Sequence, residues 1–244
     1  MLSENEAHEL LQHYVSDYRE PLKEVVYFGD YGYATDGRIA LKVHTMSSED
    51  TAPSHLPGKI DEFMAAFALQ KPMPPKFASR VLCKDLREKF DEKVAECVKD
   101  SRADLEDITR SPCPHCGKDI LIDSDGEIVS EERYKEMEEE ATDAVARRNV
   151  HVPVAFLVQP SAAGQPPVRI IVNYRYARLL VYAVGKDGEY RYGHLKGSGD
   201  AVWGRSKDGD RECVLMQMRK DDNFKGQSDM PTVELFDKEE GGVK

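Results

Sequence analysis

The stretch PLKEVVYFGDYGYATDGRIAL, which covers Pro21–Leu41, decides the fold that we expect for this chain. Val25–Phe28 is rich in β-branched and aromatic residues, which favour strands. Gly29–Gly32 has the composition of a turn, and Tyr33–Val43 is a second strand-like run. Two such runs joined by a short turn predict a β-hairpin near the start of the chain.

A helix precedes this hairpin, and further elements follow much later in the chain. Residues 3–18 predict a helix, because Ser3 is a favourable N-cap and Glu6 completes a capping box. The later elements that we expect are strands at 152–158 and 168–172, a helix at 173–184, and strands near 189–195, 200–205 and 212–218. This order predicts an α+β fold. The sequence shows no internal repeat of fixed period.

The segment between these elements has a different composition. Residues 76–148 hold 14 basic and 20 acidic side chains, and their apolar residues recur at helical spacing. One helix is expected near 81–98 and another over 130–148. We therefore expect a domain made of 1–75 and 149–220, a charged helical insertion at 76–148, and a flexible polar tail at 221–244.

The composition limits the class of protein. A net charge of −11 argues against non-specific coating of nucleic acid, although it allows one local basic face. No apolar run approaches the length of a membrane span, and no secretory signal is visible. The five cysteines are an odd number, and two form a CxxC, which indicates reduced thiols or metal ligation. We expect a cytoplasmic protein.

Two motifs resemble the bacterial DNA polymerase III beta subunit, the sliding clamp. Ala34–Gly37 matches the start of the family's A-T-D-G-H-R-L-A segment. The histidine of that segment is missing in this chain or is replaced by Arg38. Val172-Asn173 with Tyr176 is similar to its F-N-x-x-Y helix start. Residues 216–219, MQMR, are similar to its C-terminal M-P-M-R-L, with glutamine in place of proline. The order of elements agrees, and the matched segments cover less than half of the chain.

This resemblance implies a clamp-like domain, with two helices packed on an antiparallel sheet, acting as a processivity factor. In the family, the two motifs build an apolar pocket that takes client peptides ending in Leu-Phe from replication and repair proteins. The residues carried over to this pocket are Thr35, Gly37, Arg38, Ile39, Met216, Met218 and Arg219. Since the family's pocket walls come from two domains, a two-domain chain is an alternative to one domain with an insertion. The resemblance also implies a homo-oligomer.

A basic segment is the candidate contact with double-stranded DNA. Arg175 and Arg178 share a face of the predicted helix, and Lys186 follows its end. Such a set meets phosphates without reading bases, as the clamp resemblance implies. A solvated helix face is the plainer interpretation. The tail sequence at 232–236, TVELF, loosely resembles the client peptides, and a plain polar tail is the alternative.

The segment Cys113–Gly117, CPHCG, has the spacing of half a zinc site. A structural zinc ion needs four ligands, so Cys113 and Cys116 require partners. The candidates are Cys97, Cys83 and His115, of which Cys97 is the nearer choice, and a dimer could supply the rest. Unligated thiols and redox chemistry remain open alternatives.

No motif for catalysis is found: the phosphate-binding, dinucleotide and metalloprotease signatures are missing, and the histidines are scattered. We therefore expect a non-catalytic DNA-replication accessory protein. One alternative is a zinc-knuckle interaction module on an unrelated α+β fold. Another is a phage or mobile-element regulator that occupies a host clamp.

Overall fold

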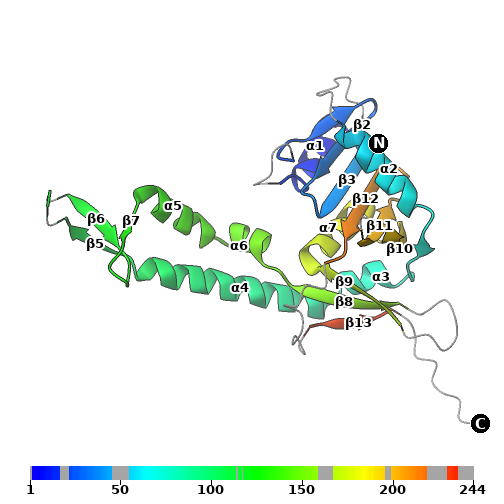
Figure 1. Ribbon diagram of the computed structural model, residues 1–244. Coiled ribbons are helices and arrows are strands. Elements are labelled where there is room, and N and C mark those ends of the chain that lie inside the picture. The colour runs from blue at the N-terminus through cyan, green and yellow to red at the C-terminus, as the bar shows by residue number, and fades with distance from the viewer. Residues whose placement is uncertain are drawn as a thin grey trace, which may run out of the picture. The chain divides into compact units, whose positions relative to one another are not determined.

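The computed structural model describes residues 2–16, 22–45, 55–113, 115–116, 118–158, 167–195, 199–218 and 230–235 (Figure 1). The chain divides into two compact units. Unit 1 comprises Met1–Cys83 and Pro153–Lys244, and unit 2 comprises Lys84–Val152. Residues 76–83, which we expected in the insertion, are therefore part of unit 1. The fold is mixed α+β with antiparallel sheets, as the sequence predicts.

A seven-stranded sheet with the order β1-β2-β3-β12-β11-β10-β4 forms the centre of unit 1. Its strands are β1 (Val26–Phe28), β2 (Tyr31–Thr35), β3 (Ile39–His44), β4 (Lys71–Pro72), β10 (Glu189–Leu195), β11 (Gly199–Arg205) and β12 (Arg211–Met216). Every neighbouring pair is antiparallel. The sheet therefore joins the two ends of the sequence through the β3–β12 pair.

The expected strand over 33–43 is two strands. The chain turns between β2 and β3, where Gly37 has a φ of 85°, a conformation that favours glycine. The Asp36 carboxylate closes this turn by accepting from the backbone N–H groups of Arg38 (2.8 Å) and Ile39 (3.0 Å). Thr-Asp-Gly is thus a turn in this chain, and β1–β2–β3 is a three-stranded meander.

Helices cover both faces of this sheet. On one face lie α1 (Glu4–Gln12) and α7 (Tyr174–Val184), and the Tyr14 hydroxyl just after α1 donates to the Leu179 carbonyl of α7 at 2.6 Å (Figure 1). On the other face lies α2 (Leu56–Phe67). Its buried side chains pack with those of the sheet in one cluster formed by Ile60, Met64, Phe67, Tyr33, Ala40, Ala201, Trp203 and Val214. Alternate residues of each strand serve the two faces, as the pleat requires. The short helix α3 (Phe77–Val81) also belongs to unit 1 and packs against α7.

Unit 1 contains two halves with the same order of elements. The first half is α1 followed by β1, β2 and β3, and the second is α7 followed by β10, β11 and β12. Ser3 caps α1 and Asn173 caps α7. Leu2 before α1 bridges to Thr45 after β3, and the Met218 N–H after β12 donates to the Ile171 carbonyl before α7 at 2.9 Å. The sheet order β1-β2-β3-β12-β11-β10 is symmetric about the β3–β12 pair. A local two-fold relation thus exists that the sequence does not reveal.

Two glycines occupy matching positions in these halves. Gly32 of β2 pairs with Tyr27 of β1, and Gly204 of β11 pairs with Tyr190 of β10. A Cβ atom on Gly32 would lie 2.5 Å from Leu11 Cδ1, and one on Gly204 would lie 2.8 Å from Val184 Cγ2. Each glycine thus lets a helix side chain rest directly on the sheet.

A second sheet in unit 1 has the order β13-β8-β9, formed by β8 (Pro153–Val158), β9 (Val168–Asn173) and β13 (Thr232–Glu234). β13 runs parallel to β8, and the Leu235 N–H donates to the Leu157 carbonyl at 3.0 Å. The expectation of a flexible tail is therefore wrong for residues 230–235, since Leu235 is buried. Among the described residues, no helix has both the length and the apolar character needed to span a membrane.

Unit 2 is a helical hairpin with a small sheet at its turn. The elements are α4 (Lys84–Glu106), β5 (Thr109–Pro112), β6 (Asp119–Ile122), β7 (Ile128–Val129), α5 (Glu131–Glu140) and α6 (Asp143–Asn149). α4 packs against α5 and α6 through Phe90 and Val94, and Arg147 pairs with Asp91 at 2.7 Å. The single helix expected over 130–148 is two helices, because the Thr142 hydroxyl caps a new helix by accepting from the Val145 N–H.

Candidate binding site

The two segments that carry the clamp resemblance are neighbours in unit 1. β3 and β12 pair with Ile39 opposite Leu215, and the Met216 N–H donates to the Arg38 carbonyl at 2.8 Å. Residues nearly 180 positions apart in the sequence are therefore adjacent in one sheet. They meet as hydrogen-bonded strands of a single unit.

The Thr35 and Ile39 side chains, which we assigned to a peptide pocket, face inward. The Thr35 hydroxyl donates to the Ile39 carbonyl at 2.8 Å and accepts from the Gly37 N–H at 3.0 Å, so its hydrogen bonds are used within the turn. Thr35 and Ile39 are both buried, with Ile39 only 1% exposed. In this structure both side chains are structural parts of the β2–β3 turn and of the core.

Arg38 lies on the surface of the same turn and joins a polar cluster with α7. Its guanidinium donates to the Tyr176 hydroxyl at 3.5 Å. Burial raises the pKa of Tyr176, and its hydrogen bond with the Asp36 carboxylate raises that pKa further. The bond with Tyr176 in turn raises the pKa of Arg38, which stays charged. Arg38 is therefore already engaged within the chain.

The methionines of the second motif precede and follow Gln217, which lines a cleft. Met216 pairs with Ala201 of β11 and is half-buried against the α2 side of the sheet. Met218 is half-buried and continues to β9 through its bond with Ile171. Arg219, the last residue assigned to the pocket, lies outside the described residues.

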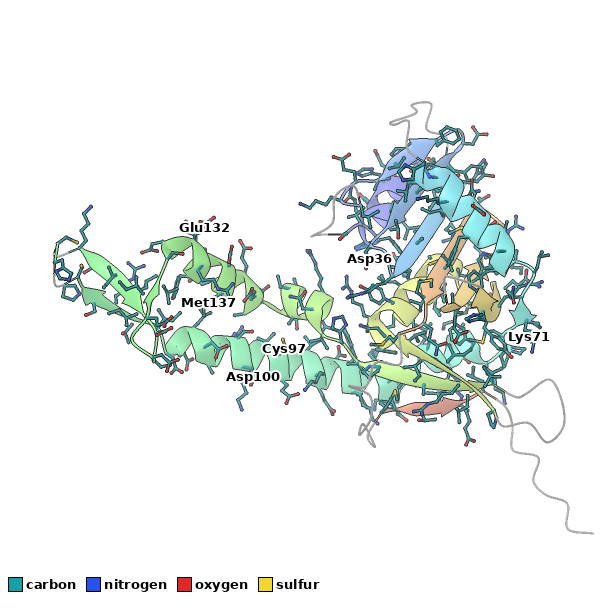
Figure 2. The ribbon with its side chains drawn as sticks, viewed as in Figure 1. Asp36, Lys71, Cys97, Asp100, Glu132 and Met137 are labelled. Carbon is teal, nitrogen blue, oxygen red and sulfur yellow. The ribbon has the colours of Figure 1, made fainter. Side chains whose placement is uncertain are left out.

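The cleft itself has a volume of about 320 Å³ and lies between the two sheets of unit 1. Its walls come from β9, β10, β11 and the segment after α2. They are formed by Gln70, Lys71, Val168, Arg169, Ile170, Tyr192, Gly193, His194, Asp200, Ala201 and Gln217. Figure 2 shows Asp36 of the β2–β3 turn and Lys71 of the cleft on opposite sides of unit 1. The cleft is thus distinct from the turn assigned to the pocket.

The polar groups of this cleft are held by cross-strand bonds. His194 and Asp200, which are opposite each other in the β10–β11 hairpin, share a hydrogen bond of 2.9 Å between Nδ1 and Oδ1. The Gln217 N–H donates to the Asp200 carbonyl at 2.8 Å. Burial raises the pKa of Tyr192, so this hydroxyl stays protonated near neutral pH. The cleft can therefore offer an apolar floor with hydrogen-bonding groups at its rim.

The cationic residues assigned to DNA lie on and after α7. Seven residues of this helix are buried, and Arg175 and Arg178 are half-buried. Their guanidinium carbons lie 5.3 Å from the Tyr176 ring centre and 5.9 Å from the Tyr174 ring centre, respectively. Lys186 is exposed beyond the end of the helix. Arg175 and Arg178 therefore expose only part of their side chains on α7.

Cys113, His115 and Cys116 lie at the turn between β5 and β6 in unit 2. The Cys113 N–H donates to the Lys118 carbonyl at 2.7 Å, which closes the turn. Cys97 lies along α4 (Figure 2). Among the described residues, no three His, Cys, Asp or Glu side chains gather as a metal site, so Cys97 is not brought to the knuckle. The reason is that α4 continues nine residues past Cys97 before the β5 strand begins.

Comparison with known proteins gives no match: no family model, no curated protein and no solved structure is similar enough to this chain.

The cleft residues were not found from the sequence, with one exception. Gln217 was noted only as a departure from the family's proline. His194 and Asp200 are six positions apart, and only the β10–β11 register brings them together. Strands were expected near 189–195 and 200–205. Pairing them as a hairpin in this register would have brought His194 and Asp200 together.

Proposed function

We propose that this chain is a non-catalytic, cytoplasmic accessory protein of DNA replication, similar to a sliding clamp, that binds client peptides. The observation that carries the proposal is the hydrogen-bonded contact between Arg38 and Met216, which joins the two motifs of the resemblance. Two packed helices on one face of an antiparallel sheet agree with the fold that the resemblance implies. The α2 helix on the other face is an addition to that plan.

We place the peptide site in the cleft beside Gln217. A volume of about 320 Å³ is at the lower end of ligand sites, and it suits two apolar side chains. Val168, Ile170 and Tyr192 offer apolar and aromatic surface for a leucine and a phenylalanine. Arg169 and Lys71 at the rim can pair with a peptide carboxylate, since both are exposed.

Fluorescence polarisation with a labelled peptide that ends in Leu-Phe tests this function. We expect saturable binding to the full chain, and we expect its loss when both apolar residues of the peptide are alanine. Gln217→Trp should weaken binding at least tenfold, because the indole would fill part of the cleft. The matched control is Lys207→Trp, on the exposed β11–β12 turn, which should leave the affinity unchanged.

A second variant separates the cleft from the carried-over pocket. Arg38→Ala removes the exposed side chain of the β2–β3 turn, which does not line the cleft. Loss of binding in Arg38→Ala with full binding in Gln217→Trp would move the site to the turn. Equal affinity for the Leu-Phe peptide and its alanine version would contradict the proposed function.

A further inference from the structure

Two of the three cysteines of unit 2, Cys113 and Cys116, lie where a second molecule can reach them. The turn Cys113–Lys118 caps the β5–β6 hairpin, and α4 before it is 23 residues long. At 1.5 Å per residue, the start of unit 2 is about 34 Å from the end of this helix. Cys116 is exposed and Cys113 is half-buried.

The backbone of this turn is arranged around the Cys113 sulfur. The N–H groups of His115 and Cys116 donate to it, and the Cys116 side chain hydrogen-bonds to it as well. Hydrogen bonds to a metal ligand of this kind orient it before the ion binds. The hydrogen bond between the two cysteine side chains makes their sulfur atoms neighbours.

Among the described residues, no third soft ligand lies beside this pair. All five cysteines and all seven histidines of the sequence are among the described residues. No three metal-binding side chains gather among those described residues. Cys97 is nine residues before the end of α4, about 13 Å along the helix axis. A tetrahedral zinc ion requires four ligands, so two must come from outside the chain.

We propose that Cys113 and Cys116 are half of a zinc site that the same two cysteines of a second copy complete. One ion then bridges two chains through the ends of their unit 2 hairpins. Each of the four Zn–S bonds forms as one thiol releases its proton to the solvent. This inference goes beyond the proposed function and does not rest on peptide binding.

The charge of unit 2 makes this association dependent on the metal. Residues 84–152 carry twelve basic and twenty acidic side chains, so two copies repel each other. Contact restricted to the turns keeps most of these charges apart, and Lys118 adds a positive charge next to the site. Without the ion, repulsion dominates and we expect a monomer.

Sedimentation velocity of the full chain, in a phosphine reductant, tests the bridge together with zinc content by mass spectrometry. With zinc we expect a species of about twice 27.6 kDa that contains one ion per two chains. A chelator should return the monomer. The double variant Cys113→Ser with Cys116→Ser should stay monomeric, while Cys83→Ser with Cys97→Ser, the matched control, should dimerise normally.

Three results would overturn the bridge. One zinc ion per monomer would mean that the site is completed within the chain. Absence of retained zinc would mean that the pair does not bind it. A dimer that persists in the chelator, or in the double serine variant with an unchanged circular dichroism spectrum, would mean that another surface joins the copies.

Discussion

At the scale of single residues, the matched glycines Gly32 and Gly204 set how closely the helices approach the sheet. We predict that Gly32→Ala destabilises unit 1 by about 1–3 kcal/mol, the usual cost of overpacking a core. The added methyl group would lie 2.5 Å from Leu11 Cδ1 and 3.1 Å from the Tyr27 ring. Urea unfolding followed by circular dichroism measures the change.

The control for this prediction is a glycine in open space. Gly58 of α2 has nothing within 4 Å of its missing Cβ, so Gly58→Ala should be neutral or slightly stabilising. Combining Gly32→Ala with Leu11→Ala should cost less than the two single changes together, because the second removes the clash. Full additivity would show that the close approach to Leu11 does not cause the loss.

The β2–β3 turn shows what residue-level reasoning could predict. The turn was missed, since Tyr33–Val43 was expected to be one strand, although Asp36-Gly37 is a turn signal that depends only on local chemistry. The inward direction of Thr35 and Ile39 depends on β12, which is nearly 180 positions away. No local pattern could show that these side chains are used by the core.

At the scale of elements, α1 and α7 are joined through the buried Tyr14 hydroxyl. We predict that Tyr14→Phe costs about 1 kcal/mol at pH 8, since the Leu179 carbonyl loses its donor. Urea unfolding measures this cost. The matched control is Tyr182→Phe, because the Tyr182 side chain is exposed on α7, the helix that carries Leu179.

Alkaline pH should weaken the same part of the protein. Burial raises the pKa of Tyr14. Burial is also the main reason that the pKa of Tyr33 is raised, and the Asp61 carboxylate raises it further. In the unfolded chain these tyrosine hydroxyls ionise near pH 10, whereas in the folded chain they stay protonated. Their contribution to the free energy of unfolding is therefore complete below about pH 10 and falls as pH rises toward the folded pKa. Each such group should contribute a slope of about 1.4 kcal/mol per pH unit. Tyr14→Phe should flatten the unfolding free energy measured between pH 10 and 11.5, and an unchanged slope would contradict this assignment.

The strand β13 gives a prediction for the small sheet. Leu235 is 3% exposed, and the Ala155 N–H donates to the Pro231 carbonyl at 2.9 Å. Leu235→Ala should release β13 and speed hydrogen exchange at Ala155, because truncating a buried leucine costs about 2–5 kcal/mol. The exposed Thr232→Ala should leave that exchange rate nearly unchanged. Equal rates in both variants would mean that Leu235 does not anchor the strand.

Elements were predictable where their signals are local. The capping box of Ser3 and Glu6 fixed the start of α1, and both of its hydrogen bonds are present. β13 was missed because its three residues have no periodicity of their own, and pairing with β8 across about 75 positions creates the strand. The Thr142 cap that divides α5 from α6 was missed, although its hydrogen bond with the Val145 N–H is local.

At the scale of the whole molecule, the α+β class could be predicted from the order of elements, whereas the cleft could not. Its walls combine positions near 70, 170, 195 and 217, which only the two sheets bring together. The local two-fold relation was equally hidden, because it is expressed in caps, turns and matched glycines and leaves no repeated sequence. Long-range strand pairing is therefore the information that sequence periodicity lacks.

Net charge also sets what the molecule can do with DNA. The chain carries −11, and the cations assigned to phosphates are Arg175, Arg178 and Lys186. Three phosphate contacts give a slope of about −2.7 for log K against log salt, since each contributes about 0.9. We therefore predict weak binding to duplex DNA that is measurable only at low salt.

Titrations of labelled duplex DNA at several salt concentrations measure this slope. Lys186→Ala should flatten the slope by about 0.9, because one counterion fewer is released. Lys99→Ala, an exposed change in unit 2, should leave it unchanged. A slope much steeper than about −2.7 would require cations beyond this face, as would arise if several copies met one duplex. Absence of binding at low salt would remove DNA from the partners of this protein and leave the peptide site to be tested alone.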